Sequence, residues 1–540
     1  MERTVFRPSK FQEEIRKLAR DLTEKELKRG IEVVGLDEMY HTLEKYRRVT
    51  GMDALKVLRD GEKTKTIEFR MFLDITEEYP REFVLKVLGE AGLLGAFIQV
   101  AYGGYGEGVT GMCIVTEEVA RVSPGVSTCY AANCLAALPL SLSATEEQKQ
   151  KYLRAIAEGK EIGAFGLTEP EAGSDAFALR MTARRDGDEY VLNNEKCFIT
   201  NAGQAGFYIV FAKTAPERGE RGISGFIVKH GTPGFSYGKK ERKMGLHCSE
   251  TRSLHFADCR VSSADLLGGP EWEGCGAIII ANTLNRSRIG QAAQSIGAAQ
   301  GAYEIAFQYA NARKQFGKNI IEFQAVSSML GDMRMQIEAA RALVYKAAWC
   351  ADHDGDKSTI AKLGAMAKYF ASEVAQSVTY NAIQVLGGNG FMEDYLVAMF
   401  YRDIRVFGIY EGTNEMQREE AARIVTKIAA RPESSRAYAQ DLEICALEDA
   451  FYDTFRAEKN RGEMGQVMRH RFSNIGSRLE AARALIEKAE EFKNPQLTTI
   501  AQCFRAETRV YAVAELAKIY DGAYRVLDAQ RASVLKTDSE

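Results

Sequence analysis

The sequence has few of the residues that build metal and disulfide sites. Its 540 residues include ten cysteines, but no two form a C-x-x-C pair and none is spaced with histidine as in a zinc site. Only six histidines occur, and neither an H-E-x-x-H nor a G-x-S-x-G motif is present. We therefore expect no metal site and no serine nucleophile, and the scattered cysteines are typical of a reducing compartment.

Two further absences limit where the protein acts. A net charge of −3 provides no excess of positive charge for nucleic acid or an anionic membrane. The first residues are charged and lack an apolar core, so they do not read as a secretory signal, and no apolar run reaches the roughly 18 residues of a membrane span. The sequence predicts a cytoplasmic protein with no nucleic-acid partner and no stable membrane anchor.

The order of apolar patterns predicts helices, then strands, then helices. Helical periodicity dominates over residues 66–163, β-like runs such as GFYIVFAKT occupy 164–275, and helical patterns return from 276. Strands gathered in one region favour α-helical domains beside a β domain and argue against a doubly wound sheet. Within the β region, DGDEYVLNNEKCFITNA is predicted to form a hairpin, because two apolar runs flank a polar turn.

Both ends of the chain extend this pattern with amphipathic helices. Residues 1–65 are predicted to form a helical extension, because Phe11, Ile15, Leu18 and Leu22 follow helical spacing. Residues 431–540 are predicted to form a second helical extension, whose apolar stripe needs a partner surface. Its members are Ile475, Leu479, Ala482, Ile486 and Ala489.

Two motifs match known sites only superficially. GEGVTG, residues 106–111, fits G-x-G-x-x-G, but no strand–turn–helix unit surrounds it. ADHDGDK, residues 351–357, is acidic, but its glycine is misplaced for a calcium-binding EF-hand. We expect both segments to be turns between helices.

Several polar, glycine-rich segments at element junctions are better candidates. Small residues and exposed backbone N–H groups, as in FGLTEPEAGSDA, suit close approach to a planar ring and a phosphate. Phe198 can stack, Thr200 can hydrogen-bond, and Arg313 can pair with a phosphate. Glu411 stands between an aromatic residue and a glycine in IYEGTNEMQ, which places a carboxylate at a break in helical structure. Taken singly, each segment is equally an ordinary turn or a solvated helix end.

Taken in order, the segments resemble the acyl-CoA dehydrogenase family. The resemblance rests on LTEPEAGSD, CFITN, RKQFGK, QVLGGNGF, YRDIRV and IYEGTNEMQ. It implies FAD, an acyl-CoA substrate, a homodimer or homotetramer, and an electron-transfer flavoprotein as electron acceptor. The implied domains are an N-terminal helical domain over 66–163, a middle β-barrel or sandwich domain over 164–275, and a C-terminal four-helix domain over 276–430.

The resemblance also assigns site residues. Along the flavin it implies Phe165, Leu167, Thr168, Ser174, Phe198, Ile199 and Thr200. For FAD bound by the neighbouring subunit it implies Arg313, Gln315, Phe316, Gln384, Gly387 and Gly388, and further flavin-side positions are Phe323, Gln324, Thr413 and Glu415. On the substrate side it implies Ser174, Asn285, Arg288, Glu411 and Gly412.

Glu411 matches the family's catalytic base. Some members carry the base on an earlier helix, at the place of Ser287, and serine cannot do that work. We expect Glu411 to take the α proton of the acyl-CoA while a hydride leaves the β carbon for flavin N5, giving the trans-2-enoyl-CoA. The alternatives are an acyl-CoA oxidase or a non-enzymatic relative that keeps FAD and serves assembly or nucleic-acid binding. Glutaryl-CoA-type members carry an arginine where Ser127 stands, which disfavours a dicarboxylic substrate.

Overall fold

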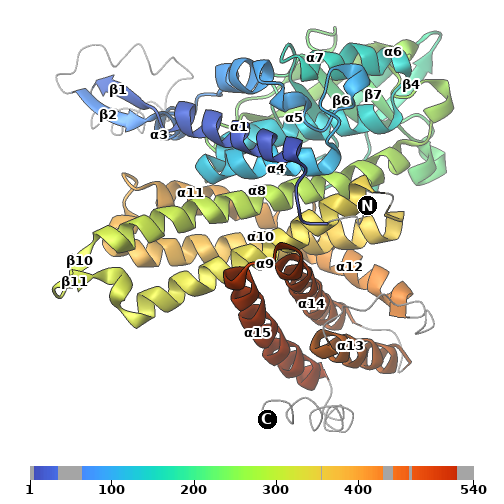
Figure 1. The fold of residues 1–540 in the computed structure, drawn as a ribbon. Helices are drawn as coiled ribbons and strands as arrows, with labels where there is room; N and C mark the ends of the chain where they lie inside the picture. The colour runs from blue at the N-terminus through green and yellow to red at the C-terminus, as the bar shows by residue number, and fades with distance from the viewer. Residues whose placement is uncertain (1–4, 35–63, 354, 430–441, 461–464, 520–540) are drawn as a thin grey trace.

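The chain folds into five parts that follow one another along the sequence (Figure 1). The structure, a computed structural model, describes residues 5–34, 64–353, 355–429, 442–460 and 465–519. Long helices cross the middle of the molecule, with the N-terminal helical domain on one side and the C-terminal extension on the other (Figure 1). The predicted order of helices, strands and helices is confirmed, whereas the predicted boundary at 430/431 lies outside the described residues.

The N-terminal domain is built on two buried helices, α4 (Gly108–Val122) and α5 (Pro124–Ser143). Helix α5 is long and apolar enough to cross a membrane by length and composition, a run that the sequence prediction overlooked. However, 72% of its apolar window is buried inside the protein, so α5 serves as a core helix. The domain also contains α3 (Phe69–Thr76), α6 (Glu146–Gln148) and α7 (Arg154–Ala157).

Charged groups fix helix α1 (Lys10–Leu27) to this domain. Arg16 Nη1 lies 3.2 Å from Glu117 Oε2, and Arg341 of the bundle approaches the other oxygen of the same carboxylate at 2.8 Å. Burial alone raises the pKa of Glu117, but Arg341 and Arg16 outweigh it and hold that pKa below its ordinary value. The extension, the domain and the bundle are therefore joined at one buried carboxylate.

The N-terminal extension is not wholly helical as predicted. Strands β1 (Gly30–Val34) and β2 (Thr64–Glu68) pair as a small antiparallel sheet. Their sequences, GIEVV and TKTIE, are rich in β-branched residues, which favour strands over helices. The remainder of the extension, residues 35–63, lies outside the described residues.

The two segments whose motifs match known sites only superficially, residues 106–111 and 351–357, contact each other. Gly108 begins α4, and the Asp352 carboxylate accepts hydrogen bonds from the backbone N–H groups of Val109 at 2.7 Å and Thr110 at 2.8 Å. A Cβ at Gly108 would lie 2.3 Å from Asp352 Oδ1, so a side chain there would displace the carboxylate. The glycine-rich segment therefore serves as a capped helix start that joins the domain to the bundle.

The β domain contains one seven-stranded sheet. The strand order is β3-β6-β4-β5-β9-β8, with β7 also paired to β6. The strands are β3 (Gly163–Gly166), β4 (Thr182–Asp186), β5 (Glu189–Thr200), β6 (Phe207–Lys213), β7 (Ile223–Lys229), β8 (Phe235–Tyr237) and β9 (Thr251–Ser262). The sheet places the ends of β3 and β5 toward the helices of the bundle.

The hairpin predicted within residues 186–202 is wrong. Strand β5 is continuous, and it pairs with β4 on one side and β9 on the other. The polar pair Asn193 and Asn194, which suggested a turn, occupies a β-bulge where the register with β9 shifts. Asn194 has φ of +126°, and a bulge accommodates such a residue without ending the strand.

The bundle contains α8 (Gly276–Ala312), α9 (Gln324–Asp352), α10 (Lys357–Leu386), α11 (Leu396–Ile404) and α12 (Asn414–Ala429). A hairpin of β10 (Lys314–Gln315) and β11 (Lys318–Asn319) joins α8 to α9 at the far end of the bundle (Figure 1). Helix α8 approaches α4 closely, because a Cβ at Gly297 would lie 2.2 Å from the Glu117 carbonyl oxygen.

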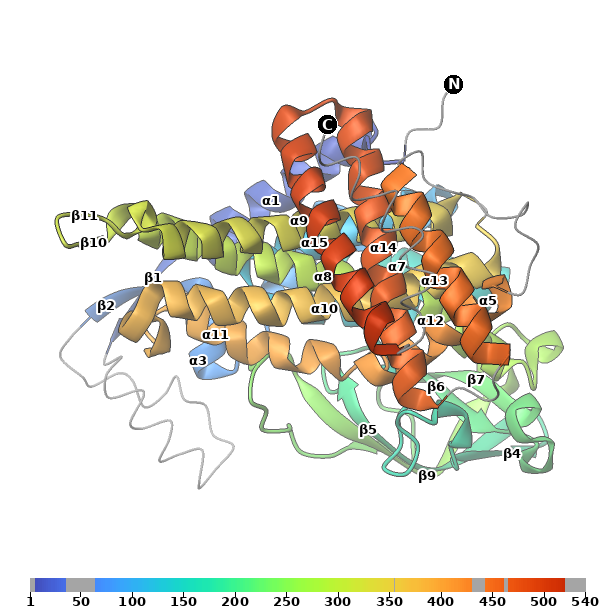
Figure 2. The same ribbon diagram turned by 90° about the horizontal axis from the view of Figure 1, so that it is seen from below.

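The C-terminal extension docks on the bundle as α13 (Leu442–Asn460), α14 (Gln466–Phe492) and α15 (Pro495–Ile519) (Figure 2). The predicted apolar stripe lies on α14, where Ile475 and Leu479 are buried. Two ion pairs cross the contact: Lys362 Nζ lies 2.5 Å from Glu480 Oε1, and Lys488 Nζ lies 3.0 Å from Glu338 Oε2. The extension thus packs as an integral layer on α9 and α10.

A core substitution on α14 tests whether the extension contributes to global stability. Phe472 is fully buried between aromatic side chains of α13, so Phe472→Ala should lower the free energy of unfolding by about 3–5 kcal/mol. Urea titration followed by tryptophan fluorescence measures this change. Val467→Ala, on the same helix but 71% exposed, is the control and should be nearly neutral. Equal stability of the two variants would show that the extension is a loosely attached tail.

Candidate active site

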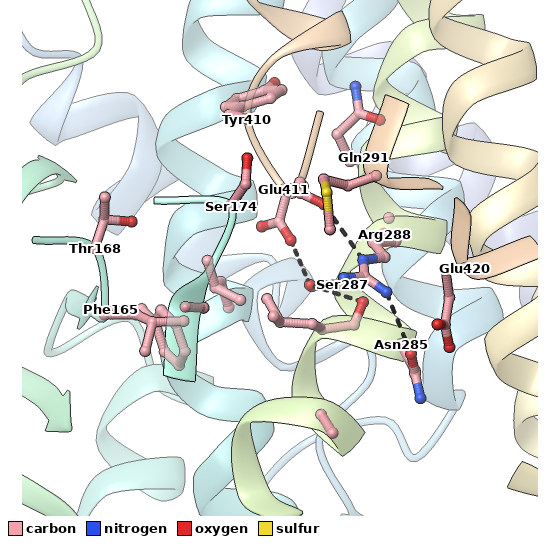
Figure 3. Close-up of a pocket in the computed structure, with 18 of the residues that line it drawn as sticks. Phe165, Thr168, Ser174, Asn285, Ser287, Arg288, Gln291, Tyr410, Glu411 and Glu420 are labelled. Atoms are coloured by element: carbon pink, nitrogen blue, oxygen red, sulfur yellow. Dashed lines mark hydrogen bonds between the residues drawn. The ribbon is translucent and has the colours of Figure 1, made fainter. Parts of the chain in front are cut away.

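A large pocket lies where the β domain, the N-terminal domain and the bundle meet (Figure 3). Its lining comes from the ends of β3 and β5 and from helices α4, α5, α8, α10, α12 and α14. The pocket volume is about 1460 Å³. Because a typical ligand site measures roughly 300–1,000 Å³, this pocket has room for two large ligands side by side.

One wall of the pocket comes from the β domain. All seven residues predicted to lie along the flavin line it: Phe165, Leu167, Thr168, Ser174, Phe198, Ile199 and Thr200. They belong to two segments that are adjacent in space, because the backbone N–H of Cys197 donates to the Thr168 carbonyl oxygen at 2.9 Å. The wall offers small side chains, hydroxyls and exposed backbone, which suit a planar ring and a phosphate.

A buried ion pair behind this wall holds the two segments together. Lys196 is fully buried, and its Nζ lies 2.7 Å from Glu169 Oε1 and 3.0 Å from the Leu167 carbonyl oxygen. Burial lowers the pKa of Lys196 to about 8, although Glu169 opposes that shift. Glu169 also accepts the backbone N–H groups of Arg180 and Met181. This pair was not predicted: Glu169 lies in the motif LTEPEAGSD and Lys196 directly precedes CFITN, but the sequence does not show that the two side chains meet.

Phe198 stands at the rim of the wall. A register shift between Lys196 and Ile199 interrupts the pairing of β5 with β9, and Phe198 has φ of +58°. Its ring is 71% exposed. An aromatic residue with a left-handed backbone and an exposed ring is uncommon, and such conformations gather at binding sites.

Glu411 faces this wall from the turn that precedes α12 (Figure 3). The Ser287 hydroxyl donates to Glu411 Oε2 at 2.7 Å, and Arg288 Nε donates to the Glu411 carbonyl oxygen at 3.3 Å. Burial raises the pKa of Glu411 above its ordinary value, although Ser287, Arg288 and Lys368 each oppose the shift. The serine at the alternative base position therefore serves as a hydrogen-bond donor to the glutamate, a role that the sequence analysis did not foresee.

The backbone at this turn is strained. Glu411 has φ of +56° and Gly412 has φ of +83°. A Cβ at Gly412 would lie 2.4 Å from Gln417 Nε2, so glycine is needed there. A non-glycine residue in this region costs of order 1–3 kcal/mol, and such strain persists where it serves a site.

A buried lysine holds the other side of the turn. Lys368 Nζ donates to Asn414 Oδ1 at 3.0 Å, and Ser372 Oγ donates to the same oxygen at 3.1 Å. Burial lowers the pKa of Lys368 to about 7, against the opposing influence of Glu411. Lys368 was not predicted, because a lysine inside an alanine-rich helix gives no sequence signal of its position.

The predicted substrate-side residues also line the pocket. Arg288 Nη1 lies 3.4 Å from Asn285 Oδ1, and Arg288 stands between Asn285 and Glu411 (Figure 3). Beyond them the pocket is bordered by charged residues of three helices: Lys357 of α10, Glu419, Glu420 and Arg423 of α12, and Arg469 of α14. Arg469 was not foreseen, since it belongs to the C-terminal extension.

The opposite end of the pocket is enclosed by α4, α5 and α8. It is lined by Met112, Thr116, Thr128, Gly290, Gln291 and Gln294, all buried, and by the half-buried Tyr410. Tyr410 Oη donates to Gln294 Oε1 at 2.5 Å. We call these seven residues the closed end.

The remaining predicted flavin residues are not at this pocket in a single chain. Arg313, Gln315, Phe316, Phe323, Gln324, Gln384, Gly387 and Gly388 lie at the far end of the bundle, around the β10–β11 hairpin and the end of α10. Asn389 Nδ2 donates to Tyr309 Oη at 2.9 Å and joins these two parts. Thr413 and Glu415 also lie outside the lining, and Thr413 Oγ1 accepts the backbone N–H of Met416 at the start of α12.

Three family models match consecutive parts of the chain. The acyl-CoA dehydrogenase N-terminal domain matches residues 65–160, the middle domain 164–259 and the C-terminal domain 274–426. A short-chain-specific acyl-CoA dehydrogenase of Megasphaera elsdenii is 44% identical over 370 residues, which is 68% of this chain and 95% of that protein.

Solved structures agree with this assignment. A chain from the study of the electron transferring flavoprotein of Acidaminococcus fermentans has 40% identity and a TM-score of 0.67, and covers 77% of this chain and 98% of that one. An acyl-CoA dehydrogenase complexed with FAD from Bacillus anthracis has 29% identity and a TM-score of 0.78, and covers 98% of this chain and 93% of that one. The chain therefore belongs to the acyl-CoA dehydrogenase family of FAD-dependent oxidoreductases.

Proposed function

We propose that the protein oxidises the Cα–Cβ bond of an acyl-CoA thioester to the trans-2-enoyl-CoA, with Glu411 as the base. The observation that carries this proposal is the half-buried Glu411, which faces the wall of predicted flavin residues across the pocket and whose pKa is raised by burial. An acyl chain between that wall and Glu411 would have its α carbon beside the carboxylate. Bound FAD supplies the acceptor at N5 for the hydride that leaves the β carbon.

The surroundings of Glu411 suit proton abstraction from a weak acid. Burial raises the pKa of its carboxylate, which brings the base closer to the acidity of an α proton. Ser287 binds Oε2 and thereby fixes the carboxylate, leaving Oε1 to take the proton. We propose that the Glu411 backbone N–H, at this strained turn, would bind the thioester oxygen as negative charge develops.

The two ends of the pocket suit the two ends of an acyl-CoA. Phosphates require cations and access to solvent, and the border has three cations: Lys357, together with Arg423 and Arg469, which pair with Glu420 and Glu419 of the same border. The acyl group would then point into the closed end. The C-terminal extension contributes Arg469 to this border, so we propose that the extension takes part in binding coenzyme A.

The far end of the bundle supports a homodimer or homotetramer. Phe316 is 94% exposed and lies on the β10–β11 hairpin, beside the predicted phosphate-binding Arg313. An exposed aromatic side chain is typical of an interaction surface. We propose that these residues reach FAD bound in a neighbouring copy of the chain.

Replacement of Glu411 by glutamine tests the base directly. Glu411→Gln keeps the size of the side chain but removes the basic oxygen, so flavin reduction should slow by at least the roughly 10²–10⁴-fold of a general base. Stopped-flow absorbance under anaerobic conditions measures the rate with a panel of acyl-CoAs. Glu147→Gln, which changes an exposed glutamate of α6, is the matched control. A Glu411→Gln rate within a few-fold of wild type would assign the base elsewhere.

Removal of the Ser287 hydroxyl should change the pH dependence. The Ser287 hydrogen bond favours the ionised form and lowers the pKa of Glu411. Ser287→Ala should therefore raise that pKa and move the acid limb of the kcat/KM profile to higher pH. Ser287→Thr, which keeps a hydroxyl, should restore the wild-type limb. If the acid limb of Ser287→Ala stays at the wild-type pH, the Ser287 hydrogen bond does not control the pKa of the base.

We further propose that a cytoplasmic electron-transfer flavoprotein takes the electrons. The A. fermentans similarity supports this acceptor, and the ten free cysteines suit a reducing compartment. After reduction by an acyl-CoA, the flavin should be reoxidised rapidly by an electron-transfer flavoprotein and slowly by dissolved oxygen. Stopped-flow reoxidation compares the two acceptors. Fast reaction with oxygen and production of hydrogen peroxide would instead identify an oxidase.

A further inference from the structure

The buried pair of Lys196 and Glu169 encloses one residue of the β-domain wall of the pocket. Thr168 lies between Leu167 and Glu169 in the chain, and Lys196 Nζ binds both of these neighbours, the Leu167 carbonyl oxygen at 3.0 Å and Glu169 Oε1 at 2.7 Å. The residue after Lys196 binds Thr168 itself, because the backbone N–H of Cys197 donates to the Thr168 carbonyl oxygen at 2.9 Å. Two consecutive residues of β5 therefore fix three consecutive residues of the segment that follows β3.

The contact with Lys196 sets the orientation of the peptide group between Leu167 and Thr168. This peptide is trans, and in a planar trans peptide the C=O and the N–H point in opposite directions. Because the Leu167 carbonyl oxygen points toward Lys196 Nζ, the Thr168 N–H points away from that lysine. The Lys196 side chain is fully buried, whereas Thr168 is half-buried and lines the pocket.

The Thr168 N–H is a donor that the protein leaves unused. Within the part of the chain that the structure describes, this N–H has no hydrogen-bond acceptor, whereas the next one along the chain, that of Glu169, donates to the Ala172 carbonyl oxygen at 3.2 Å. A backbone N–H that a ligand covers needs an acceptor on that ligand, because an unpaired buried donor is costly. The isoalloxazine ring of FAD carries carbonyl oxygens and ring nitrogens, which accept hydrogen bonds of this kind.

We propose that Lys196 is a positioning residue for FAD: it binds the Leu167 carbonyl oxygen from the buried side, and thereby presents the Thr168 N–H to an acceptor of the flavin ring. The inference rests on the proposed function, because it places the flavin against this wall. Glu169 has a different part, since it balances the charge of Lys196 and accepts the backbone N–H of Met181 at 3.1 Å. The hydrogen bond from Lys196 to the carbonyl oxygen, and not the ion pair as such, therefore controls the contact with FAD.

Three variants separate the part of Lys196 from that of Glu169. Lys196→Met keeps an unbranched side chain and removes the donor, so the FAD dissociation constant should rise by about tenfold, as for the loss of one hydrogen bond. Glu169→Gln should keep the wild-type constant: burial already lowers the pKa of Lys196 to about 8, and the neutral amine left without Glu169 still donates to Leu167. The double variant Lys196→Met/Glu169→Gln leaves no unpaired charge in the core, which guards against misfolding, but should bind FAD as weakly as Lys196→Met. Release of FAD from diluted holoprotein, followed by flavin fluorescence, measures these constants.

The visible absorption of the bound flavin is a readout that a purely structural role would not change. A hydrogen bond to the ring shifts the visible band, so the band should be the same in the wild type and Glu169→Gln and shifted in both variants that lack Lys196. With FAD in excess, these two variants should also reduce their flavin more slowly at saturating acyl-CoA, while KM for the acyl-CoA stays close to the wild-type value.

The double variant decides between the two roles. Wild-type FAD affinity and a wild-type flavin band in Lys196→Met/Glu169→Gln would overturn the inference and leave the pair as a brace within the β domain. Flavin reduction by an acyl-CoA in the wild type would in that case still support the proposed function. Weakened FAD binding in both variants that lack Lys196, with no flavin reduction by any acyl-CoA in the wild type, would overturn the function and keep the role of Lys196.

Discussion

The burial of the Glu411 carboxylate is the constraint on which the rest of the site depends. A buried carboxylate is a stronger base, but a direct ion pair would cancel that gain. The two neighbouring cations bind neutral oxygens: Arg288 donates to the Glu411 carbonyl and to Asn285, and Lys368 donates to Asn414. Both therefore order the turn, while the pKa of the carboxylate stays raised.

The need to keep the pKa of Glu411 raised by burial also explains why four parts of the chain surround one pocket. The β domain provides a rigid wall, since the buried pair of Lys196 and Glu169 fixes the two segments that form it. The close approach of α4 and α8 encloses the acyl end, and the extension borders the open end through Arg469. Removing any one layer would admit water to the carboxylate, which would lower its pKa and weaken the hydrogen bonds around it.

Local patterns in the sequence were sufficient to predict the order of helices and strands. The resemblance of the motifs implied the flavin-side residues that form the β-domain wall of the pocket. Contacts between distant segments were not accessible in this way. Ser287, Lys368 and Gln291 lie in helices whose alanine-rich surroundings predict only helix, and their meeting at Glu411 or the closed end depends on how helices pack. The continuous strand β5 was misread for the opposite reason: two asparagines signal a turn locally, but pairing on both sides keeps the strand intact.

The central claim is that Glu411 itself removes the α proton, and exchange with solvent tests it most directly. The reduced holoenzyme is incubated with an acyl-CoA in deuterium oxide without an electron acceptor, and deuterium at the α carbon is measured by mass spectrometry. The wild type should introduce deuterium at that carbon, because a base that takes the proton also returns one from solvent. Glu411→Gln should introduce none above the rate without enzyme. Exchange at the wild-type rate in Glu411→Gln would contradict this account.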